Sequence, residues 1–114
     1  MSSSEGMNAF ETYFRVSWAC KTPFVLMMDR RYAPWRRDEL MPVVEAFTDG
    51  PYVRETHDCD DFAFAFKGQI GHGIGIAWNS KHCWNIALCE DGVRHIEPQT
   101  GQLKDRTWAM LAII

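Results

Sequence analysis

The sequence lacks the cysteine spacing of a zinc site and the secretion signal that usually accompanies structural disulfides. Its four cysteines, Cys20, Cys59, Cys83 and Cys89, include no CxxC pair. A zinc knuckle is therefore not expected. The first ten residues, MSSSEGMNAF, contain neither the basic stretch nor the apolar stretch of a secretion signal. Without secretion a disulfide framework is not expected either, and we expect a reduced, cytoplasmic protein.

The sequence also lacks a long hydrophobic run and an excess of positive charge. No run approaches the roughly 20 apolar residues of a membrane span, so no membrane partner is expected. The formal net charge is −3 at pH 7, whereas nucleic-acid binders normally carry a basic patch. Nucleic acid is therefore not an expected partner. The one basic cluster is flanked by acids: Arg30, Arg31, Arg36 and Arg37 beside Asp29, Asp38 and Glu39. It could bind a phosphate or an acidic partner, but we interpret it as a solvated loop with salt bridges.

Hydrophobic residues, by contrast, are plentiful. They make up 46% of the 114 residues, and aromatic residues make up 13%. A chain of this length and composition can bury the core of one domain. We therefore predict a single domain over residues 1–114, with residues 1–7 disordered.

Three segments have the periodicity or the end signals of helices. Residues 8–19 carry aromatic side chains three and four positions apart: Phe10, Tyr13, Phe14 and Trp18. Residues 38–47 form the second predicted helix, with Asp38 as its N-cap and Pro42 distorting its first turn. The third predicted helix covers residues 59–68, after a cap at Asp58.

Three further segments have the pattern of strands. They cover residues 74–78, 83–89 and 92–98, and Asp91-Gly92 predicts a hairpin between the last two. Residues 24–28 are interpreted as a buried strand or helical segment, residues 29–37 as a loop, and the apolar C-terminal segment as a last strand or helix. Together these elements predict an α+β fold in which helices pack on an antiparallel β-sheet.

Cys59 differs from the other cysteines in its predicted position. It opens the helix at 59–68, where unpaired backbone N–H groups and the positive end of the helix dipole favour a thiolate. The neighbouring carboxylates of Asp58, Asp60 and Asp61 oppose that effect, so they must point away or bind a cation. The other three cysteines are interpreted as small buried apolar residues.

A histidine and an acid follow Cys59 in the order that thiol catalysis requires. His82 begins a strand and Glu97 ends the next one, so the two could meet across the hairpin. A thiol, an imidazole that deprotonates it and a carboxylate that orients the imidazole are the groups of a cysteine hydrolase. The other histidines compete for the role of base; His57 lies two residues before Cys59, and His95 shares a strand face with Glu97.

Four short motifs carry a resemblance to a known family. They are C-D-D-F-A at 59–63, G-I-x-x-x-W at 73–78, H-x-W-N-I-x-L-x-x-D-G at 82–92 and I-E-P-x-T at 96–100. This pattern resembles the core of transglutaminase-like and papain-like cysteine peptidases. Within that superfamily it is most similar to the peptidase domain attached to a mushroom agglutinin, and to small bacterial and phage relatives of that domain. The resemblance covers residues 29–103.

The resemblance implies a minimal papain-like or transglutaminase-like core acting on a peptide or protein substrate. Cys59 would be the nucleophile, His82 the base and Glu97 the acid that orients His82. It also implies calcium, with Asp60, Asp61 and Gln99 as ligand residues. The oxygen ligands suit Ca²⁺, and the cation would offset the acidic charge beside the thiolate. Only 23 positions separate Cys59 from His82, so little chain is left to shape a substrate cleft.

Two alternatives to a peptidase remain. A peptidoglycan amidase of the NlpC/P60 kind also begins a helix with an Asp-Cys pair, although its Gly-Asp-Leu turn is missing here. The second alternative is a catalytically inactive module, such as a phage protein that uses the same fold to bind a host protein. The reactivity of the Cys59 thiol separates an enzyme from such a module.

Overall fold

The computed structural model describes residues 6–47, 59–98, 100–104 and 107–114. It contains a six-stranded sheet with the order β2-β8-β4-β5-β6-β7, in which every pair except β2–β8 is antiparallel. These strands are β2 (Val25–Leu26), β4 (Ile74–Trp78), β5 (Cys83–Cys89), β6 (Gly92–Glu97), β7 (Gln102–Lys104) and β8 (Leu111–Ile113). The helices are α1 (Ala9–Cys20), α2 (Arg37–Ala46) and α3 (Cys59–Ile70), and β1 (Met7–Asn8) pairs with β3 (Arg31–Tyr32).

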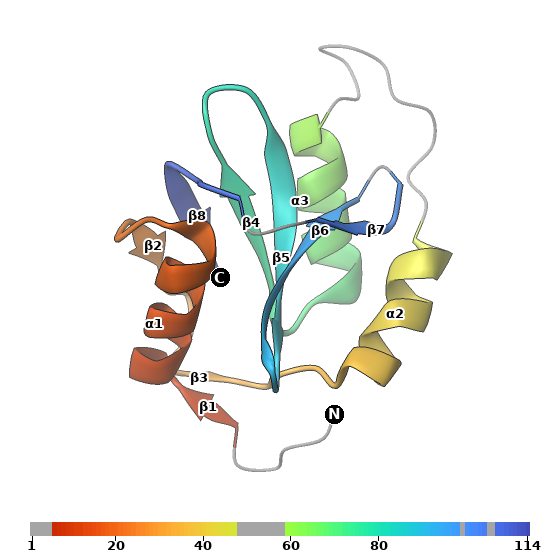
Figure 1. The fold of residues 1–114 in the computed structure, drawn as a ribbon. Helices are drawn as coiled ribbons and strands as arrows, with labels where there is room; N and C mark the ends of the chain where they lie inside the picture. The colour runs from red at the N-terminus through yellow and green to blue at the C-terminus, as the bar shows by residue number, and fades with distance from the viewer. Residues whose placement is uncertain (1–5, 48–58, 99, 105–106) are drawn as a thin grey trace.

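The helices cover both faces of this sheet (Figure 1), as the burial of β5 requires. All seven residues of β5 are buried, and successive side chains point to opposite faces. Trp84 and Ile86 pack with Val16 of α1 on one face. Ala87 and Cys89 pack on the other face with the helical residues Leu40, Val44 and Phe66. The predicted α+β fold is therefore confirmed, with its central strand enclosed between α1 and the pair α2 and α3.

Helix α1 lies within one residue of the predicted range, but its aromatic side chains point outward. Asn8 caps the helix by accepting a hydrogen bond from the Glu11 amide at 2.9 Å. Phe10, Phe14 and Trp18 are 80%, 65% and 68% exposed. The buried face consists of the smaller residues Thr12, Val16, Ala19 and Cys20. Small residues fit there because the facing sheet already carries the large side chain of Trp84.

Helix α2 begins one residue earlier than predicted, so the assignment of Asp38 as its N-cap is wrong. Arg36 occupies the cap position without a side-chain cap hydrogen bond. Asp38 lies in the first turn, where its charge suits the helix dipole, and it pairs with Arg36 at 2.8 Å. Arg36 also lies 3.9 Å from Glu39, which supports the interpretation of this part of the arginine cluster as a salt-bridged surface.

The ends of the chain contain more structure than the sequence predicts. Met7 is buried and pairs with Tyr32, so the expected disorder does not extend to this residue. Residues 1–5 and Asp58 lie outside the described residues. The predicted loop at 29–37 contains β3, and β7 was not predicted. The segment 24–28 contains the two-residue edge strand β2, and Phe24, Leu26 and Met28 are exposed rather than buried.

The strands around the hairpin match the sequence prediction closely. β4 and β5 have the predicted bounds, and β6 ends at Glu97, one residue before Pro98. Gly92 has φ 141°, a conformation available to glycine at the turn. The apolar C-terminal segment forms β8, which pairs with both β2 and β4. Of the helices that the structure describes, none combines the length and apolar character needed to span a membrane.

Candidate functional site

Cys59 is the first residue of α3 and lies half-buried against the sheet. It packs beside a small cluster of Ala63, Ile76 and Cys83. The buried amide of Asn85 ties the helix to the sheet, because its Nδ2 donates to the carbonyl of Ala63 at 2.9 Å and to that of Gly75 at 3.0 Å. These contacts fix the start of α3 relative to β4 and β5.

His82 is held by a turn whose hydrogen bonds come from Asn79. The Asn79 side-chain oxygen accepts from the amides of Lys81 at 2.9 Å and His82 at 3.1 Å. The Asn79 amide in turn donates to the His82 carbonyl at 3.0 Å. Asparagine favours such turns because its side chain can replace a backbone acceptor. The backbone of His82 is therefore fixed just before β5 begins.

His82 and Glu97 form a direct pair, as the hairpin predicted. The His82 Nε2 and the Glu97 Oε2 are 2.5 Å apart, and the two side chains are 29% and 18% exposed. With Nε2–H donating to the carboxylate, Nδ1 is the ring nitrogen that can accept a proton. Lys104 Nζ lies 4.0 Å from the same carboxylate oxygen. The second oxygen, Glu97 Oε1, is buried and has no hydrogen-bond partner among the described residues.

Trp84 packs against His82, and His95 holds Trp84 by a hydrogen bond. The Trp84 ring stacks on His82 with a centroid distance of 6.0 Å and an interplanar angle of 17°. Its Nε1–H donates to His95 Nδ1 at 2.9 Å, and His95 Nε2–H donates to the Ala19 carbonyl at 2.9 Å. Both ring nitrogens of buried His95 are thus engaged in structural hydrogen bonds, which argues against His95 as the base. Lys104 Nζ lies 4.6 Å from the Trp84 centroid.

The other two histidines do not join this arrangement. His72 stacks on Trp35 with a centroid distance of 4.3 Å, in a different pocket. His57 lies outside the described residues. The supporting roles of Trp84 and Lys104 were not predicted, although the H-x-W spacing already placed Trp84 on the face of His82.

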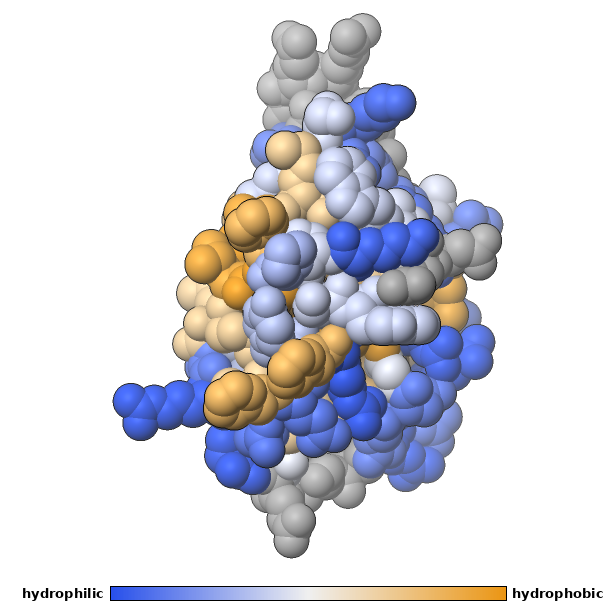
Figure 2. Space-filling model, turned by 60° about the vertical axis from the view of Figure 1, so that its left-hand side comes forward, coloured by the Kyte–Doolittle hydropathy of each residue, from blue (hydrophilic) through white to orange (hydrophobic). Residues whose placement is uncertain are grey.

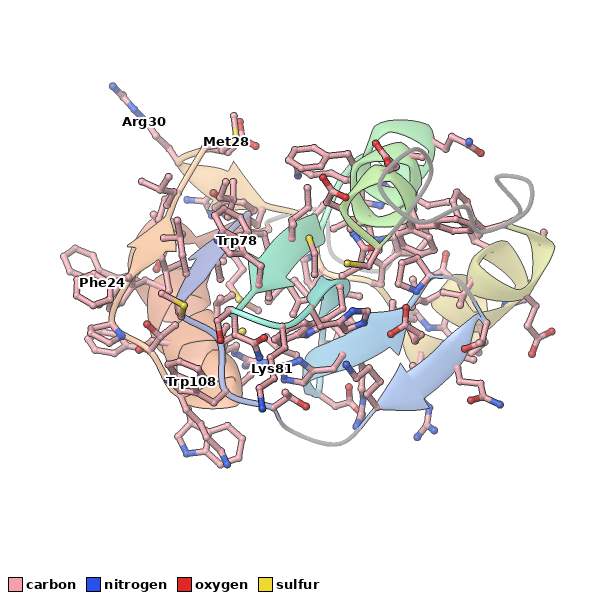
Figure 3. The ribbon with its side chains drawn as sticks, turned by 90° about the horizontal axis from the view of Figure 1, so that it is seen from above. Phe24, Met28, Arg30, Trp78, Lys81 and Trp108 are labelled. Carbon is pink, nitrogen blue, oxygen red and sulfur yellow. The ribbon has the colours of Figure 1, made fainter. Side chains whose placement is uncertain are left out.

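Cys59 and His82 line the same pocket at one end of the sheet. The pocket has a volume of about 340 Å³ and lies where α3 begins, β4 ends and β5 begins. Phe64, Trp78, Asn79 and Lys81 also line it. Trp78 and Lys81 are labelled in Figure 3, which views the molecule from this end. The structure thus brings Cys59 and His82 to one cavity, and Glu97 holds the imidazole through its Nε2.

Comparisons with known proteins show what fold this arrangement belongs to. No family model matches the chain, and no curated protein matches it. Nine chains of solved structures do match.

The fold is shared with a solved structure named "PSL1a-E64 complex". The match has a TM-score of 0.71 and 22% sequence identity, and it covers 92% of this chain and 48% of that one. This chain therefore spans about half the length of its structural neighbour. The likeness shows that the two chains share this fold.

Burial distinguishes the other three cysteines from Cys59. Burial raises the pKa of the Cys20 thiol to about 12 and is the largest cause that raises the pKa of Cys89 to about 11. Cys20, Cys83 and Cys89 are all buried, as predicted, whereas Cys59 is half-exposed. At neutral pH the thiols of Cys20 and Cys89 stay protonated and unreactive.

The residues predicted to bind calcium are only partly described. Asp60 and Asp61 are exposed in the first turn of α3, next to Cys59. Gln99 lies outside the described residues. Within the described ranges, no group of three or more His, Cys, Asp or Glu side chains is arranged to hold a metal ion. The calcium site stays a prediction.

Proposed function

We propose that this chain is a thiol-dependent acyl hydrolase, and specifically a small cysteine peptidase that uses Cys59, His82 and Glu97. Its main support is the 2.5 Å hydrogen bond between His82 and Glu97, together with the shared pocket of His82 and Cys59. Further support comes from the structural neighbour, because E64 is an inhibitor of cysteine proteases. The proposal includes the family that the sequence motifs resemble, the peptidase domain of a mushroom agglutinin.

In the proposed reaction, His82 Nδ1 takes the proton of the Cys59 thiol and the sulfur attacks the substrate carbonyl. Glu97 stabilises the imidazolium that forms, because the carboxylate already accepts from Nε2. The tetrahedral intermediate then collapses to a thioester as the amine leaves with the proton from His82. Water, deprotonated by His82, attacks the thioester and releases the carboxylic acid. The Cys59 amide, at the start of α3, is a candidate donor to the oxyanion.

The experiment compares the cysteine of the proposed site with a cysteine outside it. A mixed peptide library is incubated with the wild type, with Cys59→Ala and with Cys89→Ala, and cleavage is followed by mass spectrometry. Cys89 is buried in β5, does not line the pocket and has no proposed role in catalysis. Cleavage should be lost in Cys59→Ala and retained in Cys89→Ala. A Cys59→Ala protein that still cleaves peptides would disprove the mechanism.

Calcium is part of the proposal as a cofactor. Asp60 and Asp61 fit it in chemistry and access, because Ca²⁺ prefers carboxylate oxygens and both side chains are exposed. Together with Gln99 they would hold the ion, whose charge would offset that of the carboxylates beside Cys59. We expect isothermal titration calorimetry to detect Ca²⁺ binding in the wild type and to show at least tenfold weaker binding in Asp60→Asn. Equal Ca²⁺ affinities of the wild type and Asp60→Asn would contradict the proposed calcium site.

A binding module without catalysis is the second candidate function, and one observation favours it. Phe10, Phe14 and Trp18 form an exposed aromatic stripe on α1, which is typical of a protein-binding surface. On the face shown in Figure 2, hydrophobic residues lie exposed among hydrophilic ones. A Cys59 thiol no more reactive than glutathione would favour this function over the hydrolase.

A further inference from the structure

Two aromatic side chains, Phe64 and Trp78, line the pocket beside Cys59. Phe64 projects from α3 with 58% of its side chain exposed, although its neighbours Phe62 and Phe66 are buried. Trp78 lies at the end of β4 and is half-buried. A pocket of about 340 Å³ is at the small end of the range for ligand sites, roughly 300–1,000 Å³. It therefore suits one large side chain rather than a whole peptide.

Outside the catalytic pair of Cys59 and His82, the pocket carries no excess charge of one sign. Its other charged lining residues are Asp60 and Lys81, one of each sign, and both are exposed. A charged ligand side chain would lose hydration against Phe64 and Trp78 without gaining a dedicated partner. An apolar side chain would instead cover aromatic surface that is now in contact with water.

Other exposed apolar side chains lie along the same end of the sheet, and together with the pocket they are called the apolar surface here. Trp78 pairs with Cys83 of β5 on one side and with Leu111 of β8 on the other. Two exposed side chains adjoin this row: the Met110 amide donates to the Trp78 carbonyl at 2.8 Å, and the Asn79 amide group donates to the Trp108 carbonyl at 3.2 Å. Trp108 and Met110 are 50% and 48% exposed.

Phe24 ends this surface at the edge of the sheet. Its carbonyl accepts from the Ala112 amide at 3.0 Å, and its ring is 66% exposed. In Figure 3 the labelled Trp78, Trp108 and Phe24 lie on the side of the molecule away from α2. Three strand spacings separate β5 from β2, roughly 14 Å, which is about the length of four residues of an extended peptide.

We propose that this surface binds the substrate, and that the enzyme selects peptides with a large apolar side chain next to the scissile bond. Phe64 and Trp78 would set this preference, and Trp108, Met110 and Phe24 would contact apolar residues farther along the peptide. The inference rests on the proposed function, because it takes the Cys59 pocket as the place of reaction. It goes beyond it by naming the substrate class.

The test uses reagents that need no turnover. Chloroacetamide and its N-phenethyl, N-carboxyethyl and N-aminoethyl derivatives carry the same reactive group and differ in the attached side chain. Rates of Cys59 alkylation are measured by intact mass and peptide mapping, and each is divided by the rate of the same reagent with glutathione. The normalised alkylation rate of the N-phenethyl reagent should be about tenfold higher than that of chloroacetamide, which is the factor expected when an aromatic group is largely buried. The normalised rates of the two charged reagents should not exceed that of chloroacetamide.

Variants then assign the gain to the pocket walls. Phe64→Ala and Trp78→Ala should each remove most of the N-phenethyl advantage, and Phe64→Leu should restore part of it. Phe10→Ala, which removes an exposed aromatic ring outside the pocket, should keep the advantage. Phe64 is mostly exposed, so its variants test the proposal even if Trp78→Ala lowers stability.

Two results would overturn the inference. Equal normalised rates for all four reagents would show that the pocket has no apolar preference. An N-phenethyl advantage that persists in Phe64→Ala and Trp78→Ala would place the preference elsewhere. Both results are distinct from failure of the proposed function, which is decided by peptide cleavage in Cys59→Ala.

Discussion

Glu97 is the residue whose role follows most directly from a single contact. Its carboxylate accepts from His82 Nε2 at 2.5 Å, so it both orients the ring and balances the charge of an imidazolium. Glu97→Gln removes that charge and should lower kcat by roughly 10²-fold, within the range for acid–base groups, with little effect on KM. Peptide-cleavage kinetics measure both constants. Glu90→Gln makes the same charge change at an exposed position and should leave kcat unchanged.

Several residue-level predictions were possible because strand alternation and hairpin register are local properties. The Asp91-Gly92 turn fixes which residues of β5 and β6 face each other, and this brings His82 and Glu97 together. The choice between His82 and His95 could not be made in this way, since both share a face with Glu97. It depends on Ala19, a residue of α1 that lies 76 positions away from His95 and accepts its Nε2–H.

At the scale of elements, β4 fits closely between β5 and β8 because Gly75 has no side chain. A Cβ at this position would lie 2.4 Å from the Ile113 carbonyl oxygen and 2.9 Å from Ile86 Cγ1. Gly75→Ala should therefore destabilise the fold by about 3 kcal/mol, the upper end of the usual cost of overpacking. Urea denaturation measures the change in the free energy of unfolding.

Gly68 provides the matched control. It lies exposed inside α3, and a Cβ there would meet nothing within 4 Å. Gly68→Ala should stabilise the protein by roughly 0.5–1 kcal/mol, because alanine loses less backbone entropy in a helix. Equal effects of the two substitutions would contradict the close packing at Gly75.

The range of α1 could be predicted from the sequence, but the face that it buries could not. Its aromatic residues recur at helical spacing, yet Val16, Ala19 and Cys20 face the sheet. Which stripe is buried depends on the volume of the partner surface, here Trp84 and Ile86, and on how closely the backbones approach. The exposure of β2 could not be predicted for the same reason: its sequence is apolar, but the strand lies at the edge of the sheet.

At the scale of the whole molecule, the buried thiols predict how stability depends on pH. Cys20 and Cys89 have folded-state pKa values of about 12 and about 11, above the ordinary value of 9.0. The unfolded chain therefore loses these protons first, and stability should fall as pH rises above about 9, by up to about 1.4 kcal/mol per pH unit for each thiol. Lys67, whose pKa burial lowers from 10.5, opposes part of this trend.

Urea denaturation at pH 7.5, 9 and 10.5 measures this dependence. The double variant Cys20→Ala, Cys89→Ala should be less stable at pH 7.5, because small cavities are left in the core. Its stability should nevertheless fall less steeply with pH than that of the wild type. The account of the buried thiols fails if the two proteins have parallel pH dependences.

At this scale, the size and lining of the pocket are the features that could be predicted least well from the sequence. The short interval between Cys59 and His82 suggested little room for a substrate, yet Phe64 and Trp78 enclose about 340 Å³ with them. Such a cavity results from the crossing of α3 over the ends of β4 and β5, which no local pattern encodes. The match covers about half the length of the structural neighbour.

We propose that His82, held by Glu97, activates the thiol of Cys59. The most direct test is the rate at which iodoacetamide alkylates Cys59 at pH 7, compared among the wild type, His82→Ala and the control His72→Ala, which changes an exposed histidine outside the Cys59 pocket. The wild type and His72→Ala should react at least tenfold faster than glutathione, and His82→Ala should lose this advantage. Equal alkylation rates in the wild type and His82→Ala would contradict it.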